Sequence, residues 1–402
     1  MKSHLGYKTV FLGTKKMTAL FIFVSQYIKK NKQKINAFHF TSLKMNYSEL
    51  LASEPHDIAA HMQLKYVDRE ALTIQRVKKK DKFLYLLKNK PLQKETELKR
   101  IKKLVIPPAW QEVKIASIAN AHLQAVGYDL KHRLQYRYHE LWLRVRNRTK
   151  FLRMHHFGQA LPSIRKQVDE DLQLQGWPKD KVLALIVRLM EETHIRIGNQ
   201  QYAKRNKTYG LSTLRNKHLK TSKNKLKFEF TGKKGKKHSI TLNNKRLRRL
   251  VLQCEEIPGW NLFQFFDEDG IKTNVDSGMV NEYLQEISGE LFTAKDFRTW
   301  SGTIIFFESL LENAPTNDET QIKKNVIKAF DATAKALGNT RNVCKKYYVH
   351  PYVVSTYENG GLKKVFQNLE KQSSSAYQTA AEKALIKLIS DFNPLLNLSK
   401  KN

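Results

Sequence analysis

The apolar positions of the chain change their spacing near residue 139. Between Tyr66 and about Tyr138 they form short runs, among them KFLYLL (Lys82–Leu87) and HLQAVGYDL (His122–Leu130), and VIPPAW is a proline-containing turn. Such runs predict strands and hairpins. After HRLQYRYHELW the spacing becomes helical. The pattern therefore predicts an α+β protein, with a small β-rich domain over residues 46–138 and a mainly helical domain over 139–402.

Several stretches of the second domain predict helices. DKVLALIVRLMEETHIRIGN (Asp180–Asn199) is largely apolar, with Asp180 as the expected N-cap and Gly198-Asn199 as the expected stop. Further helices are expected at DSGMVNEYLQEI, AKDFRTWSGTIIFFESLLEN, ETQIKKNVIKAFDATAKALGN and SAYQTAAEKALIKLISDFNP, the last two stopping at Gly338 and at Asn393-Pro394. Between the first two helices, KLKFEFTGKKGKKHSITL (Lys225–Leu242) alternates on both sides of a glycine-containing turn and predicts a β-hairpin.

The first ~45 residues differ from the rest. MTALFIFVSQYI is apolar and lies between basic residues, but it is short for a membrane span and no small-residue cleavage site follows it. A signal peptide is one interpretation. We favour the other, in which Met45 or a nearby position is the true start and residues 1–45 are an extension that is disordered or missing from the mature protein.

The charge of the chain indicates a polyanionic partner. Its 72 Lys and Arg against 37 Asp and Glu give a net charge of +35, which attracts nucleic acid first and anionic membranes second. Residues 201–250 alone hold 17 Lys and Arg and one acidic residue, Glu229. A solvated face is the ordinary explanation of a charge run. Tyrosines lie among these cations, however, and phenols and cations together contact nucleic-acid phosphates.

The residues offer covalent rather than metal-dependent chemistry. Cys254 and Cys344 match no metal spacing and fit a reducing cytoplasm, and the chain has no HExxH, P-loop or GxSxG motif. An enzyme acting on nucleic acid would then use a side-chain nucleophile, with cations stabilising the charge of the transition state. Arg196, Lys233 and Arg298 are candidate cations, and the adjacent Tyr347 and Tyr348 are candidate nucleophiles. We expect no metal and no cofactor.

The motifs resemble those of a known family. RIGNQQYAKRNKTYGLSTLRNKHLK, FTGKKGK, AKDFRTWSGT and LGNTRNVCKKYYVHP follow one another as in type IB DNA topoisomerases, specifically the bacterial, poxvirus-like branch. IPPAW and LQYRYH extend the resemblance to the first domain, so that it covers about Tyr66 to Tyr352. It implies an enzyme that relaxes supercoiled DNA without ATP or metal, and an architecture that closes as a C-shaped clamp around the duplex.

The resemblance also implies roles for individual residues. Tyr348 would attack the scissile phosphodiester and form a 3′-phosphotyrosyl link, Arg196 and Arg298 would stabilise the pentacoordinate phosphorus, and Lys233 would protonate the leaving 5′-oxygen. Asn339, nine residues before Tyr348, stands where poxvirus and eukaryotic members have a histidine, and the bacterial branch shares the asparagine. Its amide can donate a hydrogen bond but cannot transfer a proton. Tyr347 departs from the small residue that is usual there.

Further contacts are carried over from the family. The resemblance implies that the DNA backbone is contacted by Arg133, Tyr136, Tyr138, Tyr202, Tyr209 and Lys217. It also implies a monomer that acts on double-stranded DNA in the nucleoid of the cytoplasm, with no small-molecule substrate and no membrane. On a helix, neighbouring side chains point about 100° apart, so Tyr347 and Tyr348 are not expected to face the same phosphate.

Two other classes of function remain open at this point. Tyrosine recombinases share most of the chemistry, but they carry HxxR around the second arginine, where this chain has Lys295-Asp296-Phe297-Arg298. A non-catalytic basic protein that binds and bends DNA would share the charge but form no covalent adduct. A supercoiled plasmid in EDTA without ATP separates the three, because they predict topoisomer ladders, recombined products and unchanged plasmid.

Overall fold

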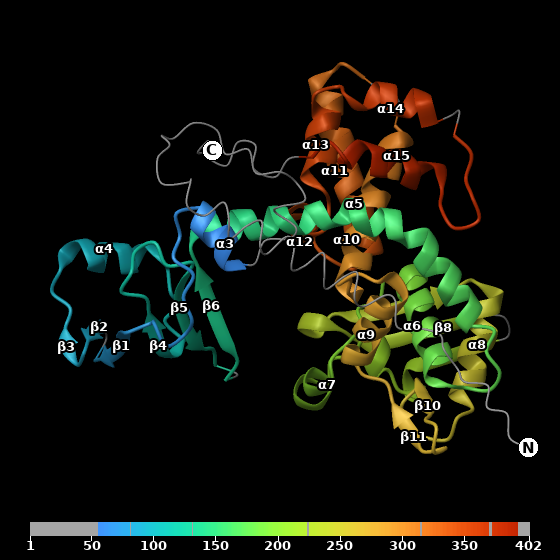
Figure 1. Cartoon of the computed structure of the whole chain (residues 1–402), viewed down its shortest axis with the longest axis horizontal. Helices are drawn as coiled ribbons and strands as arrows, with labels where there is room; N and C mark the ends of the chain where they lie inside the picture. Colours follow the sequence, from blue (N-terminus) through green and yellow to red (C-terminus); the bar gives the residue numbers. More distant parts are fainter. Residues whose placement is uncertain are drawn as a thin grey trace, which may run out of the picture. The chain divides into compact units, whose positions relative to one another are not determined.

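The computed structural model describes residues 55–80, 82–130, 132–222, 225–313, 316–369 and 372–392, all within the unit Tyr47–Asn402 (Figure 1). The expected N-terminal extension and the expected stop at Asn393-Pro394 lie outside these residues. Within them the chain is β-rich at first and mainly helical afterwards, which confirms the predicted α+β class. None of the helices in the described ranges is both long enough and apolar enough for a membrane-spanning segment.

The first region is built on an antiparallel sheet of six strands in the order β3-β2-β1-β4-β5-β6. The strands are β1 (Ile74–Lys79), β2 (Lys82–Leu87), β3 (Lys90–Pro91), β4 (Gln111–Ile115), β5 (Leu123–Tyr128) and β6 (Leu134–Tyr138), with helices α3 (Pro55–His61) and α4 (Glu95–Lys103). Ile101 of α4 is buried with Ile74, Ile115 and Ala125 of the sheet. Strands β2 and β5 lie in the two segments for which the sequence predicted strands, so both predictions are confirmed.

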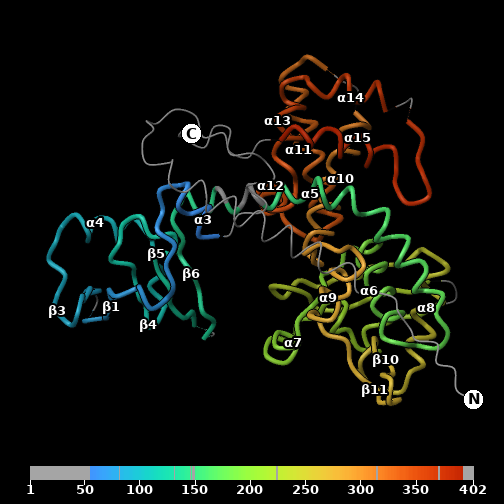
Figure 2. The backbone as a smooth tube through the Cα atoms, in the orientation of Figure 1, coloured from blue at the N-terminus to red at the C-terminus, as the bar shows by residue number. Residues whose placement is uncertain are grey.

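The second region is mainly helical and shares one large hydrophobic core. Its helices are α5 (Glu140–Asp171), α6 (Lys179–Thr193), α7 (Gln200–Asn206), α8 (Lys245–Glu255), α9 (Ser277–Ser288), α10 (Ala294–Leu311), α11 (Glu319–Ala336), α12 (Arg341–Tyr347), α13 (Pro351–Glu358), α14 (Leu362–Leu369) and α15 (Ala380–Ile389). Helix α10 contacts α5, α6, α9, α11 and α15, and Figure 2 shows α5, α11 and α15 close to it. A side chain on α10 is thus held by the core from several sides.

The predicted hairpin is present and belongs to a small sheet. Strands β8 (Lys225–Thr231) and β9 (Lys237–Leu242) pair antiparallel, and β7 (Leu219–Ser222) adds a third strand beside β8. A short 3-10 turn, η4 (Lys233–Gly235), forms the tip, where Lys234 and Gly235 have φ values of 63° and 76°. A second, two-stranded ribbon is formed by β10 (Gln264–Phe266) and β11 (Lys272–Asn274).

The predicted ends of the first helix were wrong. Helix α6 runs from Lys179 to Thr193, because His194 adopts the left-handed conformation (φ 55°) and closes the helix. The next residues are extended beside a second segment, where the amide of Leu211 donates to the carbonyl of Arg196 (2.9 Å). Asn199 caps the start of α7 instead of ending α6. Arg196 therefore lies in the connection between α6 and α7, whereas the sequence had predicted it inside the helix Asp180–Asn199.

The other predicted helices agree better with the structure. Helices α9, α10 and α11 lie where the sequence places them, and Asp276 and Asp318 cap α9 and α11 as an aspartate at this position does. Gly338, with φ 60°, follows the end of α11. Helix α15 begins later than expected, because Thr379 caps it.

Candidate active site

Arg298 is the most firmly held cation of the site. It lies on α10, is 5% exposed and is flanked by the buried Phe297 and Trp300. Its guanidinium donates to the carbonyl oxygen of His194 and, at 2.9 Å, to that of Leu337. These carbonyls follow the ends of α6 and α11, so one side chain ties two chain segments to a third. A buried cation with two backbone acceptors has a fixed position and orientation.

Arg196 and Asn339 are joined directly, although 143 residues separate them. An Nη of Arg196 donates to Oδ1 of Asn339 at 2.7 Å. The amide nitrogen Nδ2 of Asn339 is buried and has no hydrogen-bond partner among the described residues. Because the oxygen is already occupied by Arg196, the orientation of the amide is fixed, and its two N–H donors stay available. A buried donor without a partner is unfavourable unless a ligand satisfies it.

The backbone of Tyr348 is positioned by α10. Tyr348 follows the last residue of α12, and its carbonyl oxygen accepts a hydrogen bond from Oγ1 of Thr303 (2.9 Å). The neighbouring Gly302 allows this approach, since a Cβ at that position would lie 2.8 Å from Cβ of Tyr348. The centre of the Arg298 guanidinium lies 5.3 Å from the centroid of the Tyr348 ring. The contacts of Tyr348 with Gly302 and Thr303 therefore place its phenol beside Arg298.

The charges around Tyr348 change how easily the phenol ionises. Burial raises the pKa of the Tyr348 hydroxyl, but the positive charges and hydrogen bonds of Arg298 and Arg196 outweigh this, so the pKa lies below its ordinary value. Burial, together with the charge of Arg196, lowers the pKa of Arg298 to about 10. Arg298 is then still charged at neutral pH. A larger fraction of the phenol is therefore ionised at pH 7 than in a free tyrosine, where it is only about 0.1%.

Tyr347 lies in different surroundings from Tyr348, as expected for neighbouring residues. Its side chain is 41% exposed, and the side-chain nitrogens of Lys150 and Lys346 lie 5.2 and 5.5 Å from the centroid of its ring. The amine of Lys150, on α5, also donates to the carbonyl oxygen of Tyr347 at 3.0 Å. Lys150 thus holds the chain one residue before Tyr348, and the sequence pattern had not singled it out.

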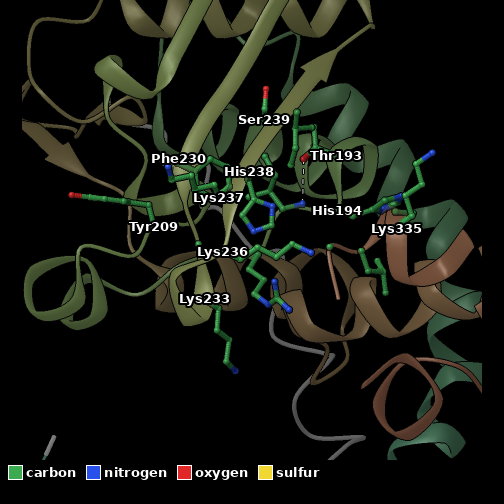
Figure 3. A pocket seen from close by; sticks show the side chains of 17 residues that line it. Thr193, His194, Tyr209, Phe230, Lys233, Lys236, Lys237, His238, Ser239 and Lys335 are labelled. Carbon is green, nitrogen blue, oxygen red and sulfur yellow. Dashed lines mark hydrogen bonds between the residues drawn. The ribbon is translucent and has the colours of Figure 1, made fainter. Parts of the chain in front are cut away.

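Lys233 lies at the rim of the same site. It follows β8 in the η4 turn and is exposed, and together with Arg196 it lines a pocket of about 210 Å³. Figure 3 shows its side chain extending away from His238, which lies at the centre of the view. The structure thus brings Arg196, Arg298, Asn339 and Tyr348 together and leaves the ammonium of Lys233 outside that group.

The residues expected to contact the DNA backbone lie in several elements. On β6, Tyr136 is 43% exposed and stacks on Tyr138, whose ring also lies under the guanidinium of Arg146. Arg133, just before β6, is exposed but forms an ion pair with Asp129 at 2.6 Å. That pairing reduces the charge that Arg133 offers to a phosphate.

The remaining predicted contacts belong to the helical region. Tyr202 on α7 is 52% exposed, and Lys217 in the 3-10 turn η3 (Asn216–His218) is exposed as well. Tyr209 is half-buried, and its ring packs against His218 at 4.4 Å. Tyr202 and Lys217 are free to meet a ligand, whereas most of the Tyr209 ring is used in packing.

Two features of the site escaped the sequence analysis. Gly302 and Thr303 position Tyr348 from within a helix, and a glycine inside a predicted helix is the signal that could have shown it. His238 on β9 lines the pocket but had been seen only as part of the hairpin. The described residues contain no group of three or more His, Cys, Asp or Glu arranged to hold a metal ion.

Comparison with known proteins identifies the class to which this fold and site belong. The family model for the catalytic core of eukaryotic DNA topoisomerase I matches residues 140–376, more than half of the chain. The model for the N-terminal domain of bacterial DNA topoisomerase IB matches residues 82–129. The first match covers the helical region and the second falls in the six-stranded sheet.

Similar proteins are found in several viruses. DNA topoisomerase 1B of Acanthamoeba polyphaga mimivirus is 36% identical over 295 residues, which cover 71% of this chain and 88% of the viral protein. DNA topoisomerase 1 of rabbit fibroma virus (28% identity) covers 56% of this chain and 68% of its own length, and DNA topoisomerase 1B of vaccinia virus (24% identity) covers 61% and 74%. The chain belongs to the type IB DNA topoisomerase family.

Proposed function

We propose that this topoisomerase relaxes supercoiled duplex DNA through a covalent link between Tyr348 and the 3′-phosphate of a cut strand. The observation that carries this is the placement of the Tyr348 phenol beside two guanidinium groups, which hold its pKa below the ordinary value. Membership of the family supports relaxation as the reaction and favours neither a recombinase nor a non-catalytic DNA-binding protein.

The steps use groups that the site contains. The Tyr348 hydroxyl loses its proton to water, and its oxygen forms a bond to phosphorus while the bond from phosphorus to the 5′-oxygen breaks. A proton from the Lys233 ammonium neutralises that leaving oxygen. Arg196 and Arg298 stabilise the negative charge on the non-bridging oxygens, as preorganised donors do in other enzymes. The 5′-hydroxyl then attacks the phosphotyrosine in the reverse reaction, with Lys233 taking the proton back. Because the phosphodiester energy is kept in the link, ATP is not consumed.

We assign Asn339 the role of an additional hydrogen-bond donor. Arg196 occupies its oxygen, so its unpartnered N–H groups can donate to a phosphate oxygen. Because Lys233 is exposed on the hairpin, its proposed role requires this turn to close over the phosphate once DNA is bound. We further propose that the enzyme is a monomer and works in the nucleoid of the cytoplasm. Residues 46–138 would act as its DNA-binding domain and 139–402 as its catalytic domain.

The decisive experiment combines plasmid relaxation with adduct trapping. In EDTA and without ATP, the enzyme should convert supercoiled plasmid into ladders of topoisomers, and denaturation during the reaction should leave DNA attached to protein through a 3′-phosphate. Tyr348→Phe should form no adduct and still bind DNA. Tyr347→Phe, which changes the exposed neighbour, should still form the adduct and at most slow the reaction. Loss of the adduct in Tyr347→Phe alone would show that the nucleophile is wrongly assigned.

A further inference from the structure

His238 lies where two catalytic segments approach each other. Its ring stacks on Phe230 of the neighbouring strand, with centroids 5.0 Å apart and an angle of 14°. One edge of the ring faces Gly232, where a Cβ would come within 2.7 Å of the imidazole Cδ2 and Nε2. Another edge faces Gly338, where a Cβ would lie 3.0 Å from the imidazole Cε1. The imidazole therefore fills the space between two glycines.

The positions of these glycines connect the ring to the site. Gly232 directly precedes Lys233, and Gly338 directly precedes Asn339. The first pair lies at the tip of the hairpin, and the second follows α11, so without His238 the two segments would share fewer contacts. A contact closer than a Cβ would permit is possible only because both neighbours are glycines.

The surroundings indicate that the ring packs in its uncharged form. Burial lowers the pKa of His238, and the positive charges of Arg196, Lys236 and Arg298 lower it further. Neither ring nitrogen forms a hydrogen bond with another of the described residues. What the protein uses is thus the flat, apolar faces and edges of the imidazole, with the pocket lining visible around it in Figure 3.

We propose that His238 is a positioning residue. Its ring packs between the turn that carries Lys233 and the turn that carries Asn339, and it holds the two turns at the distance at which both act on one phosphate. This rests on the proposed function, in which Lys233 protonates the leaving oxygen. His238 itself touches neither the phosphorus nor the leaving group. This packing explains how an exposed lysine at the tip of a hairpin can be positioned correctly relative to a site that is built by helices.

The test measures single-turnover cleavage of a suicide duplex and, separately, non-covalent DNA binding. His238→Ala should slow cleavage about tenfold or more, as part of the roughly 10²- to 10⁴-fold that a general acid contributes, with little change in binding. His238→Phe keeps a flat ring of similar size and should restore most of the rate. Thr241→Ala, an exposed position on the same strand, should behave as the unaltered enzyme.

A substrate with sulfur in place of the bridging 5′-oxygen shows whether the defect acts through Lys233. A thiolate leaves without protonation, so the defect of Lys233→Ala and most of that of His238→Ala should disappear on this substrate. Combining His238→Ala with Lys233→Ala on the oxygen substrate should be little slower than Lys233→Ala alone, since residues that act through one group are not additive.

Each other outcome contradicts a definite statement. If Lys233→Ala is not rescued by sulfur, the proposed general acid is wrong. If Lys233→Ala is rescued by sulfur, three results for His238→Ala would contradict its positioning role. These are a normal cleavage rate, an effect on cleavage that adds fully to that of Lys233→Ala, and a loss of DNA binding alone. A His238→Phe variant as slow as His238→Ala would show that the ring nitrogens matter and would also overturn that role. Should His238→Ala unfold at the working temperature, His238→Val, which suits a strand, replaces it.

Discussion

At the residue scale, the site combines few side chains with strict orientation. Arg298 is fixed by two backbone carbonyls, and Arg196 by the oxygen of Asn339. The same arginine pair lowers the pKa of Tyr348, the proposed nucleophile, and in the proposed reaction it also binds the phosphate. The sequence did not reveal that the same two arginines would have both roles, because this depends on which side chains meet in the folded protein.

The amide of Asn339 can be tested one atom at a time. Asn339→Asp keeps the oxygen that accepts from Arg196 but replaces the free donor with a second acceptor. We expect it to slow single-turnover cleavage by about 10²-fold, the loss seen when one transition-state donor is removed. Asn339→His, which restores an N–H donor, should retain far more activity. Equal rates for the Asp variant and the unaltered enzyme would exclude a donor role.

The ionisation of Tyr348 predicts a pH dependence. With the sulfur-bridged substrate, which needs no proton from Lys233, the cleavage rate should rise with pH as the phenol loses its proton. Because the pKa lies below its ordinary value, the curve should level off below pH about 10, the ordinary tyrosine value. In Arg298→Gln, which removes the larger of the two charge effects, the plateau should move to higher pH. An unchanged plateau would show that Arg298 does not act on the phenol.

At the element scale, α10 organises the catalytic region, and α15 completes its support. Glu382 of α15 is 4% exposed, accepts two hydrogen bonds from Arg165 of α5 at 2.7 and 2.8 Å, and accepts a third from Trp300 of α10. Burial raises the pKa of Glu382, but Arg165 outweighs it, so the pKa lies below the ordinary value. The last described helix is thus joined to the helix that carries Arg298.

Removing this carboxylate should destabilise the catalytic region. Glu382→Gln leaves Arg165, whose side chain is 15% exposed, with Glu191 as its ionised partner among the described residues. We expect a loss of about 3 kcal/mol, measured by denaturant unfolding. Glu319→Ala, which removes an exposed ion pair with Lys323, is the control and should change stability by less than about 1 kcal/mol. Since the folded pKa is lowered, the Glu382 contribution exists above its unfolded pKa and is lost as the pH falls through the folded value. A loss equal to that of the control would contradict a supporting role.

Several elements were predictable from local patterns, although many of the shorter helices and strands were not. The hairpin Lys225–Leu242 and the helices around Arg298 and before Gly338 follow from alternation, capping residues and glycine. The end of α6 did not follow, because apolar residues continue beyond Thr193 while the chain turns extended to pair with the segment around Leu211. A tertiary contact overrode the local helical pattern there.

At the scale of the whole molecule, the charge is the dominant property. A net charge of +35 exceeds what solubility requires and suits a duplex with its dense phosphates. The charge is concentrated in residues 201–250, which include α7 and the hairpin that carries Lys233. Binding and catalysis are therefore expected to share the same surface.

The charge predicts a steep salt dependence of DNA binding. If about 6–10 phosphates are contacted, the logarithm of the affinity should fall with the logarithm of salt concentration with a slope of several units. Lys217→Ala, which removes one exposed cation, should reduce the slope by about one unit without changing sequence preference. Arg133→Ala should change it less, because that guanidinium is paired with Asp129. A flat salt response would contradict phosphate-dominated binding.

Alternation, caps, glycines and charge act over a few neighbouring residues, so the class of fold, the basic character of the chain and the order of the motifs could be predicted without a structure. Which distant side chains meet could not: Arg196 with Asn339, Gly302 with Tyr348, and His238 with Gly232 and Gly338. These contacts depend on how α10 and its neighbours pack in the core, and no local pattern records that packing. The site therefore becomes visible as one unit only in three dimensions.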